Sequence, residues 1–178
     1  MIGLLRFVGI LNAAIWLGTA IFLTFGAAPS VVSSEMEKLL ATKNFPYFAA
    51  GISQILWGRY FTFQLVCGVI AILHLVGERL YLGKTPDKLW LALVIALFTI
   101  TLAESTYVQL KLTNLNRARF ATNLRVEERQ AAGEAFQNWR IVVQVANFLV
   151  MGGLGIYLWQ MANRGEATRF VSTNKFRS

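Results

Sequence analysis

The sequence has few charged residues, a single cysteine and a single histidine, and each scarcity excludes a class of protein. Only 15% of the 178 residues are charged, whereas a soluble domain carries about 25%. The single cysteine, Cys67, allows no intrachain disulfide and no thiol-rich metal site. A b-type haem inside a helical bundle commonly needs two histidine ligands, and His74 is alone. We therefore expect no metal site and no cofactor, and we interpret His74 as an interior histidine.

Enzyme motifs are also missing from the sequence. It contains no nucleophile–base pair, no phosphate-binding loop and no HExxH motif, so we predict no catalytic residue and no enzymatic activity. The net charge of +8 does not come with a basic patch interleaved with aromatic residues, so nucleic-acid binding is not expected. We attribute the surplus of basic residues to anchoring at a membrane interface.

Long uncharged segments dominate what remains. The composition is 56% hydrophobic, and residues 7–34, 60–77 and 141–163 contain no Asp, Glu, Lys or Arg. About 20 apolar residues cross a bilayer as a helix. The sequence therefore predicts an all-α integral membrane protein, a four-helix antiparallel bundle in one domain over residues 1–163. Its expected spans are residues 4–28, 60–81, 89–110 and 141–161, and residues 164–178 follow as a basic polar tail.

The ends of the spans are marked by proline and aromatic residues. Pro29 is expected to end the first span, which at 22 apolar residues is too long for the hydrophobic region of a cleaved signal peptide. Tyrosine and tryptophan favour the headgroup level of a bilayer. We therefore place the remaining span ends near Trp57, Tyr60, Tyr81, Trp90, Tyr107, Trp139, Tyr157 and Trp159.

The connections between spans are unequal in length. Spans two and three are joined by a short turn, whereas the other two connections have about thirty residues each and lie on the same side. Residues 46–57 and 126–139 have helical character, the latter with Glu127 and Glu128 in its first turn. We expect the two long loops to form a helical cap on one face of the bundle. The alternative is that each helix extends the following span.

Basic residues give only a weak indication of orientation. Eight Lys and Arg lie on the side of the termini and nine on the side of the long loops. The eight are concentrated in shorter segments near span ends, which favours a cytoplasmic location. We therefore expect both termini in the cytoplasm.

Glu104 is the one acidic residue placed inside a span. Residues 89–103 are apolar apart from two threonines and carry no charge, and Lys88 comes just before them. Because these fifteen residues are too few to cross a bilayer, a span of normal length must include Glu104. An ionisable group at that depth is costly unless it is paired or faces water, and it marks a candidate site. We favour an ion pair with Arg59 at the start of span two, or with Lys111. The alternative is a functional pocket for a polar ligand or a cation.

Other polar residues within the spans fall into two layers by depth. Gln64, Gln144 and Asn147 lie with Glu104 near the face of the long loops, and Asn12 and His74 lie nearer the opposite face. Along span two the residues of helical spacing predict one stripe facing the bundle interior: Tyr60, Gln64, Cys67, Ala71, His74 and Glu78. Small-residue pairs such as Gly9/Ala13 and the glycines 152, 153 and 155 predict close helix packing.

Two segments resemble a known family. LNAAIWLGTAIFLTFGAAP (residues 11–29) and GRYFTFQLVCGVIAILHL (residues 58–75) are similar to the first two spans of the bacterial domain of unknown function 4149. That family is related to eukaryotic transmembrane protein 205. The resemblance implies a four-span protein of the bacterial inner membrane with no catalytic residues, and its eukaryotic relatives are associated with transport.

The functional prediction is a non-enzymatic protein that binds or transports a small molecule or ion through its intramembrane polar layer. The alternative is an accessory or scaffold subunit of a larger membrane complex. Expected partners are the lipid bilayer and either other membrane-protein subunits or further copies of the chain. A cavity reaching Glu104 from the face of the long loops would favour binding, and a filled interior would favour the scaffold.

Overall fold

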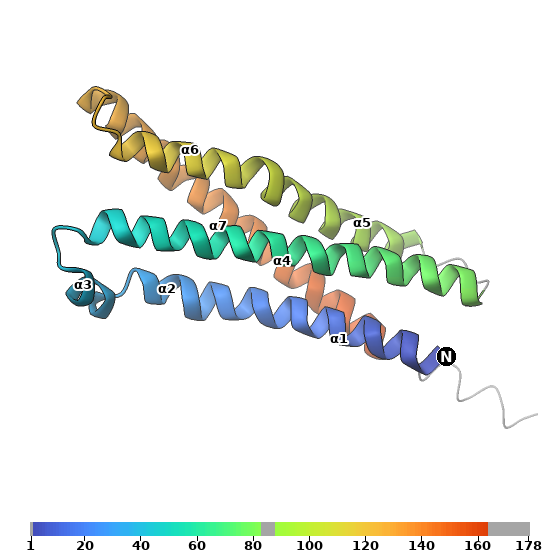
Figure 1. Cartoon of the computed structure of the whole chain (residues 1–178). Helices are drawn as coiled ribbons and strands as arrows, with labels where there is room; N and C mark the ends of the chain where they lie inside the picture. Colours follow the sequence, from blue (N-terminus) through green and yellow to red (C-terminus); the bar gives the residue numbers. More distant parts are fainter. Residues whose placement is uncertain (1, 83–87, 164–178) are drawn as a thin grey trace, which may run out of the picture.

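In the computed structural model, which describes residues 2–82 and 88–163, the protein is all-α with four long apolar helices that pack together (Figure 1). The predicted tail at residues 164–178 lies outside the described residues. In chain order the elements are α1 (Ile2–Ile21), the π-helical turn η1 (Phe22–Ala27), α2 (Ala28–Val31), α3 (Ser34–Leu40), α4 (Phe45–Leu82), α5 (Lys88–Ala103), the π-helical turn η2 (Glu104–Val108), α6 (Gln109–Phe120) and α7 (Val126–Asn163).

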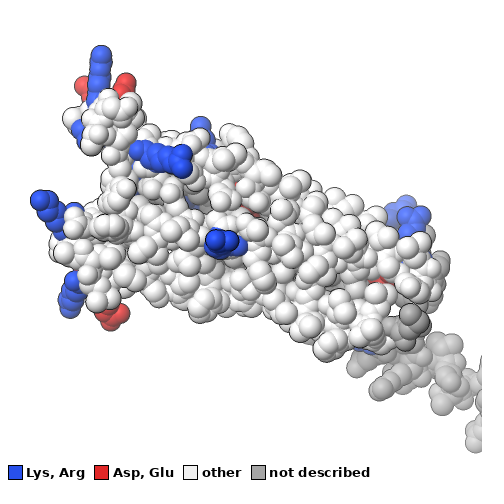
Figure 2. Space-filling view, in the orientation of Figure 1, with Lys and Arg blue, Asp and Glu red and all other residues white. Residues whose placement is uncertain are grey.

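These elements make four long helices and one short one. α1, η1 and α2 are continuous, as are α5, η2 and α6, and α3 is a short helix in the first connection. Successive long helices run in opposite directions, and α7 packs beside both α1 and α6 (Figure 1). All four are long and apolar enough to cross a membrane. On the face shown in Figure 2, charged side chains lie mainly toward the two ends of the bundle. These features indicate a multi-pass membrane protein.

The long helices extend further than the sequence predicted. α4 begins at Phe45 instead of residue 60, α7 begins at Val126 instead of residue 141, and α6 continues to Phe120. Most residues assigned to a cap of loops therefore continue the long helices, as the alternative prediction for residues 46–57 and 126–139 had it, and within the described chain only α3 is a separate helix in a connection. The start of α7 is stabilised because the Glu128 carboxylate accepts a hydrogen bond from the Arg125 backbone N–H at 3.1 Å.

Pro29 does not end the first helix, contrary to the prediction. The helix continues through α2 to Val31, and Ala28 keeps helical backbone angles although a proline follows it. The preceding π-helical turn, η1, has a wider hydrogen-bonding pattern than an α-helix. The Ser30 hydroxyl also donates to the Gly26 carbonyl at 2.7 Å. The missing N–H of proline is therefore tolerated within a continuous helix.

Hydroxyl groups on the outer surface bond to their own helices. Thr62, Thr99 and Thr106 are exposed and Thr19 is partly exposed, and each donates to the carbonyl four residues earlier at 2.7–3.0 Å. Such a bond satisfies the hydroxyl donor without a partner from solvent. These side chains can therefore face lipid at little cost.

The bundle has two parts, which differ in packing. We call α1, α5 and the C-terminal halves of α4 and α7 the closed half, and η1, α2, η2, α6 and the N-terminal halves of α4 and α7 the open half. In the closed half the rings of Trp90 and Tyr157 stack with centroids 4.6 Å apart and an interplanar angle of 16°. Both side chains are buried, as is Trp16. Trp90 and Tyr157 are therefore core residues that pack between helices, and their placement at the headgroup level stays a prediction.

The predicted stripe on span two is confirmed. Tyr60, Gln64, Cys67, Ala71 and His74 on α4 are all buried, whereas Glu78 at the end of the predicted stripe is only partly buried. Their spacing of three or four residues keeps them on the face of α4 that contacts the other helices. This stripe connects the closed half to the polar residues of the open half.

Candidate functional site

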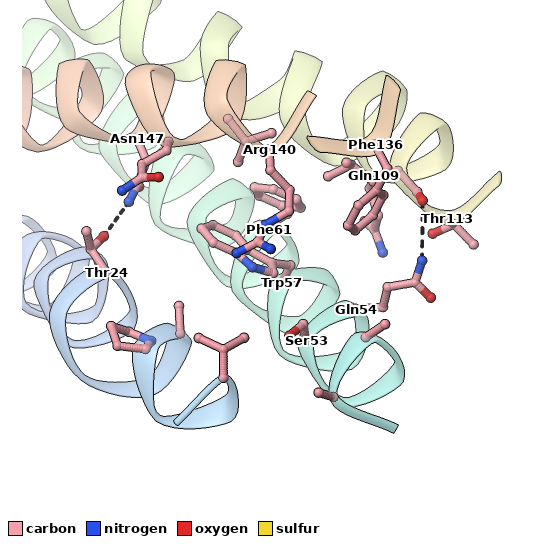
Figure 3. A pocket seen from close by; sticks show the side chains of 18 of the residues that line it. Thr24, Ser53, Gln54, Trp57, Phe61, Gln109, Thr113, Phe136, Arg140 and Asn147 are labelled. Atoms are coloured by element: carbon pink, nitrogen blue, oxygen red, sulfur yellow. Dashed lines mark hydrogen bonds between the residues drawn. The ribbon is translucent and has the colours of Figure 1, made fainter. Parts of the chain in front are cut away.

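A hydrogen-bond network joins three helices in the open half. The Tyr60 hydroxyl on α4 donates to Oδ1 of Asn147 on α7. The Asn147 amide donates from Nδ2 to the Thr24 hydroxyl at 2.5 Å (Figure 3), and Thr24 in turn donates to the Ala20 carbonyl at 2.7 Å. Tyr60 and Asn147 are buried, so their polar atoms require partners within the protein. The network provides those partners and holds the three helices in register.

Glu104 and Gln64 lie next to this network but are not satisfied by it. Tyr60 faces both side chains, and Glu104 is only 3% exposed and Gln64 fully buried. Among the residues that the structure describes, neither carboxylate oxygen of Glu104 has a hydrogen-bond partner, and neither do the amide oxygen and nitrogen of Gln64. Glu104 begins the π-helical turn η2, a distortion that occurs frequently at functional sites. Two unpaired polar side chains therefore lie in the centre of the bundle.

The predicted ion pair of Glu104 is not formed. Arg59 and Lys111 are both exposed, whereas Glu104 is buried without a hydrogen-bond partner. The prediction considered depth along the helix axis and ignored direction around it. Consecutive residues differ by about 100° around a helix. Because Tyr60 points into the interior, its neighbour Arg59 points away from Glu104.

A cavity of about 400 Å³ fills the space where α2 and α7 diverge. Its volume lies in the range of pockets that bind small organic molecules. Pro29 and Val32 on one side and Arg140 and Gln144 on the other are exposed and line it, so its mouth lies between α2 and α7. The buried residues Phe61, Leu112, Phe136, Val143 and Asn147 line the interior.

The lining of the cavity is mainly aromatic and aliphatic, with a few polar groups. Trp57 and Phe61 of α4 and Phe136 of α7 form much of the apolar wall (Figure 3). Polar side chains come from all four long helices, namely Thr24, Ser53, Gln54, Gln109, Thr113, Arg119, Arg140, Gln144 and Asn147. An apolar pocket with a small number of placed polar groups is typical of a ligand site.

The cavity approaches Glu104 but does not reach it. Asn147 lines the cavity, Tyr60 lies behind Asn147, and Glu104 faces Tyr60. Glu104 itself is not among the lining residues. The chain of side chains from the cavity to the carboxylate therefore passes through one amide and one phenol.

The predicted site residues are divided between three places. Gln144 and Asn147 line the cavity, Glu104 and Gln64 lie behind it, and Arg59 lies on the outer surface. Asn12 and His74, the second predicted layer, lie in the closed half, and their side chains contact backbone carbonyls. Asn12 donates to the Cys67 carbonyl at 3.0 Å, and Nε2 of His74 lies 2.9 Å from the Leu5 carbonyl. His74 is thus an interior histidine, as predicted. In the described chain no three His, Cys, Asp or Glu side chains are grouped as metal ligands would be.

Several lining residues were missed by the sequence analysis. Trp57, Arg119 and Arg140 were assigned to interfaces or loops, because extension of the following spans through residues 46–57 and 126–139 was only the alternative, and residues 111–120 were not expected to continue the third span. Thr24 was missed because threonine in an apolar span is common. A helix continuous from residue 45 onward would have placed Trp57 one turn from Phe61, on the same face of α4.

Comparison with known proteins identifies the family. The family model described as domain of unknown function (DUF4149) matches residues 11–121, which include all of α2, α4 and α6. The cavity residues of α7 lie beyond the matched segment. No curated protein and no solved structure matches the chain significantly. Because the match covers more than half of the sequence, the chain belongs to the DUF4149 family.

Proposed function

We propose that this protein binds a small molecule, without catalysing a reaction on it, in the cavity between α2 and α7. The observation that carries the proposal is the cavity itself. It has a volume of about 400 Å³, walls supplied by all four long helices, and a mouth formed by exposed residues of two diverging helices. A bundle whose function was to provide a rigid scaffold would have no need to keep these helices apart.

The polar network supports a role in binding more than in packing alone. Asn147 lies in the cavity wall and is held by Tyr60 and Thr24, so its orientation is fixed before a ligand arrives. Fixed polar groups at the inner end of an apolar pocket give orientation and specificity to a bound molecule. Transport would require movement of the ligand past Tyr60, and we propose binding as the first step of any such process.

Blocking the cavity tests this proposal. Ala50 lines the cavity on α4, and Ala50→Phe would fill part of it. The matched control is Ala92→Phe on α5, where alanine is exposed on the outer surface. Native mass spectrometry after extraction in mild detergent should find a bound small molecule on the wild type and on Ala92→Phe, and not on Ala50→Phe.

Two results would contradict the proposal. Identical bound molecules on wild type and Ala50→Phe would place the ligand elsewhere, and a wild type free of small molecules but associated with another polypeptide would support the accessory-subunit alternative. Circular dichroism on both variants shows whether the added ring has disturbed the helices.

We also propose that the chain lies in a bacterial inner membrane with both termini in the cytoplasm, so that the mouth of the cavity lies toward the external side. The support is the concentration of basic residues in short segments near the termini and at residues 84–88. The only native cysteine, Cys67, is buried. A cysteine introduced at position 125 should therefore be labelled from outside intact cells by a membrane-impermeant maleimide. Labelling from outside at position 84 instead would reverse the orientation.

A further inference from the structure

The cavity carries positive charge and no negative charge. Two arginines are among its lining residues, Arg119 of α6 and Arg140 of α7, and no aspartate or glutamate is. Glu104 is not a lining residue, and Tyr60 and Asn147 lie between it and the cavity. Within the described chain neither arginine forms an ion pair with an acidic side chain. The cavity therefore favours ligands with an acidic group.

The position of Arg119 is fixed by aromatic rings. Its guanidinium carbon lies 4.4 Å from the centre of the Phe120 ring and 5.1 Å from that of Phe136. These distances are within the range of favourable cation–π contacts. Phe136 is buried and also lines the cavity. The ring contacts hold the guanidinium at the cavity wall and leave its N–H donors free of protein carboxylates.

Arg140 adds a second positive charge at the same place. Arg119 and Arg140 both line the cavity, and Figure 3 shows the Arg140 side chain pointing from α7 toward Trp57 and Phe61. Two guanidinium groups on neighbouring helices can bind the oxygens of one carboxylate, sulfate or phosphate group with charge-assisted hydrogen bonds. A bound anion would also relieve their mutual repulsion.

The rest of the cavity suits an apolar body. Its walls are formed by Pro29, Phe45, Trp57, Phe61 and Phe136, and its mouth lies between two membrane helices. A molecule with a long apolar part can enter through such a mouth from the bilayer and leave that part among the aromatic residues. A small inorganic anion would leave these walls unoccupied.

We propose that the ligand of this cavity is an anionic amphiphile, with its acidic group between Arg119 and Arg140 and its apolar part against Trp57 and Phe61. This inference rests on the proposed function and specifies the class of molecule bound there. The side chains of Asn147 and Gln144, which also line the cavity, would contact the part of the ligand next to its acidic group.

Quenching of Trp57 fluorescence by brominated probes tests the inference. The probes are 9,10-dibromo-octadecyl sulfate, which is charged at every working pH, and the neutral 9,10-dibromo-octadecanol, each added to protein in a non-ionic detergent. Subtracting the signal of Trp57→Phe isolates Trp57 from the other four tryptophans. We expect saturable quenching by the sulfate, with a Kd about tenfold or more below that of the alcohol, because charge-assisted hydrogen bonds form only with the former.

Paired arginine variants locate the charge. Arg119→Gln/Arg140→Gln should raise the Kd for the sulfate to that for the alcohol. The control Arg117→Gln/Arg125→Gln removes the same two charges from exposed positions at the same end, outside the cavity lining, and should leave the Kd unchanged within about twofold, as expected for screened surface charges. Arg119→Lys/Arg140→Lys should recover part of the preference if charge is the cause. If the first pair does not fold, the ratio between sulfate and alcohol in the wild type still decides the question.

Each failure has a distinct outcome. Equal saturable quenching by both probes would overturn the anionic ligand and leave the binding function standing. The absence of saturable Trp57 quenching by either probe would overturn both. Displacement by inorganic sulfate as effectively as by unbrominated oleyl sulfate would show that a small free anion, and not an amphiphile, occupies the site.

Discussion

The closed and open halves of the bundle are built from the same four helices but are packed in different ways. In the closed half Gly9 lies against the His74 ring and Gly153 against the Leu97 side chain, where an added Cβ would come within 2.7 and 2.8 Å of its neighbour. In the open half α2 and α7 diverge, and the space between them is a cavity lined by larger side chains. Small residues at contact positions let helices approach closely, so their placement decides where the bundle closes.

The two halves also treat polar groups differently. Asn12 and His74 in the closed half are each bonded to a backbone carbonyl. Among the described residues, Glu104 and Gln64 at the inner limit of the open half have no hydrogen-bond partner, and in the closed half Nε1 of Trp16 and Nδ1 of His74 also lack one. An unsatisfied buried polar group costs about 1–3 kcal/mol, and a charged one costs more. Each half has its own buried apolar cluster, and what sets the open half apart is a cavity beside a buried carboxylate, the costlier kind of group to leave unsatisfied.

Substitution of two tryptophans, one in each half, should give the largest difference in unfolding free energy. Trp90 in the closed half is 1% exposed and stacks on Tyr157, whereas Trp57 in the open half borders the cavity. Trp90→Ala should reduce the free energy of unfolding by about 3–5 kcal/mol, the range for a buried aromatic residue. Trp57→Ala should cost less than about half of that, because part of its surface already faces empty space.

Unfolding by sodium dodecyl sulfate, followed by circular dichroism in one non-ionic detergent, measures both variants. Equal losses for Trp90→Ala and Trp57→Ala would mean that the open half is packed as tightly as the closed one.

A pair of glycines gives an intermediate effect. In Gly9→Ala the new methyl group would press on the His74 ring and disturb its contact with the Leu5 carbonyl. We expect a loss of about 1–3 kcal/mol in unfolding free energy, as for other overpacked contacts. In Gly58→Ala the methyl group meets only the end of the Gln109 side chain at 2.8 Å, and Gln109 borders the cavity and has room to move.

The same detergent titration should therefore place Gly58→Ala within about 0.5 kcal/mol of the wild type, the size of effect usual where no contact is broken. Gly152→Ala, with no atom of another side chain near the added carbon, serves as the control for helix propensity. A loss in Gly58→Ala as large as that in Gly9→Ala would show that Gln109 is held rigidly.

The smallest effect is expected for the coupling energy between Arg59 and Glu104, measured in a double-mutant cycle. The two side chains are not paired, since Arg59 is exposed and Glu104 is buried without a partner. Glu104→Leu should leave the protein equally stable, or more stable by about 1–3 kcal/mol, because an unsatisfied group is removed. The coupling energy between Arg59→Ala and Glu104→Leu should stay within about 0.5 kcal/mol, as for independent sites.

The cycle uses unfolding free energies of the two single variants and the double variant. A coupling energy well above that range, with each single variant destabilised and the double variant recovering, would indicate that the two groups are paired in the membrane.

Patterns along the chain predicted the helices and one buried face well. The uncharged segments predicted four long apolar helices. The three- and four-residue spacing on span two predicted the interior face of α4, formed by Tyr60, Gln64, Cys67, Ala71 and His74. The residues of the first two spans predicted the family. These features depend on neighbours in sequence, because hydrophobicity and helical spacing are properties of a single segment.

The limits of the helices were harder to predict. Hydropathy identifies the apolar part of a helix, and it does not by itself show that residues 45–59 and 126–140 continue α4 and α7 into the open half. The prediction of a cap arose from this difference. It also hid Trp57, Arg119 and Arg140, which line the cavity.

The sequence by itself determined an all-α membrane protein with four spans and a buried acid at Glu104, because these follow from local composition and length. Only the tertiary structure decided that Glu104 faces Tyr60 and not Arg59, that Trp90 and Tyr157 stack in the core, and that α2 and α7 diverge around a cavity. The reason is geometric: the direction of a side chain around its helix, and the distance between two helices, are set by contacts between residues far apart in sequence.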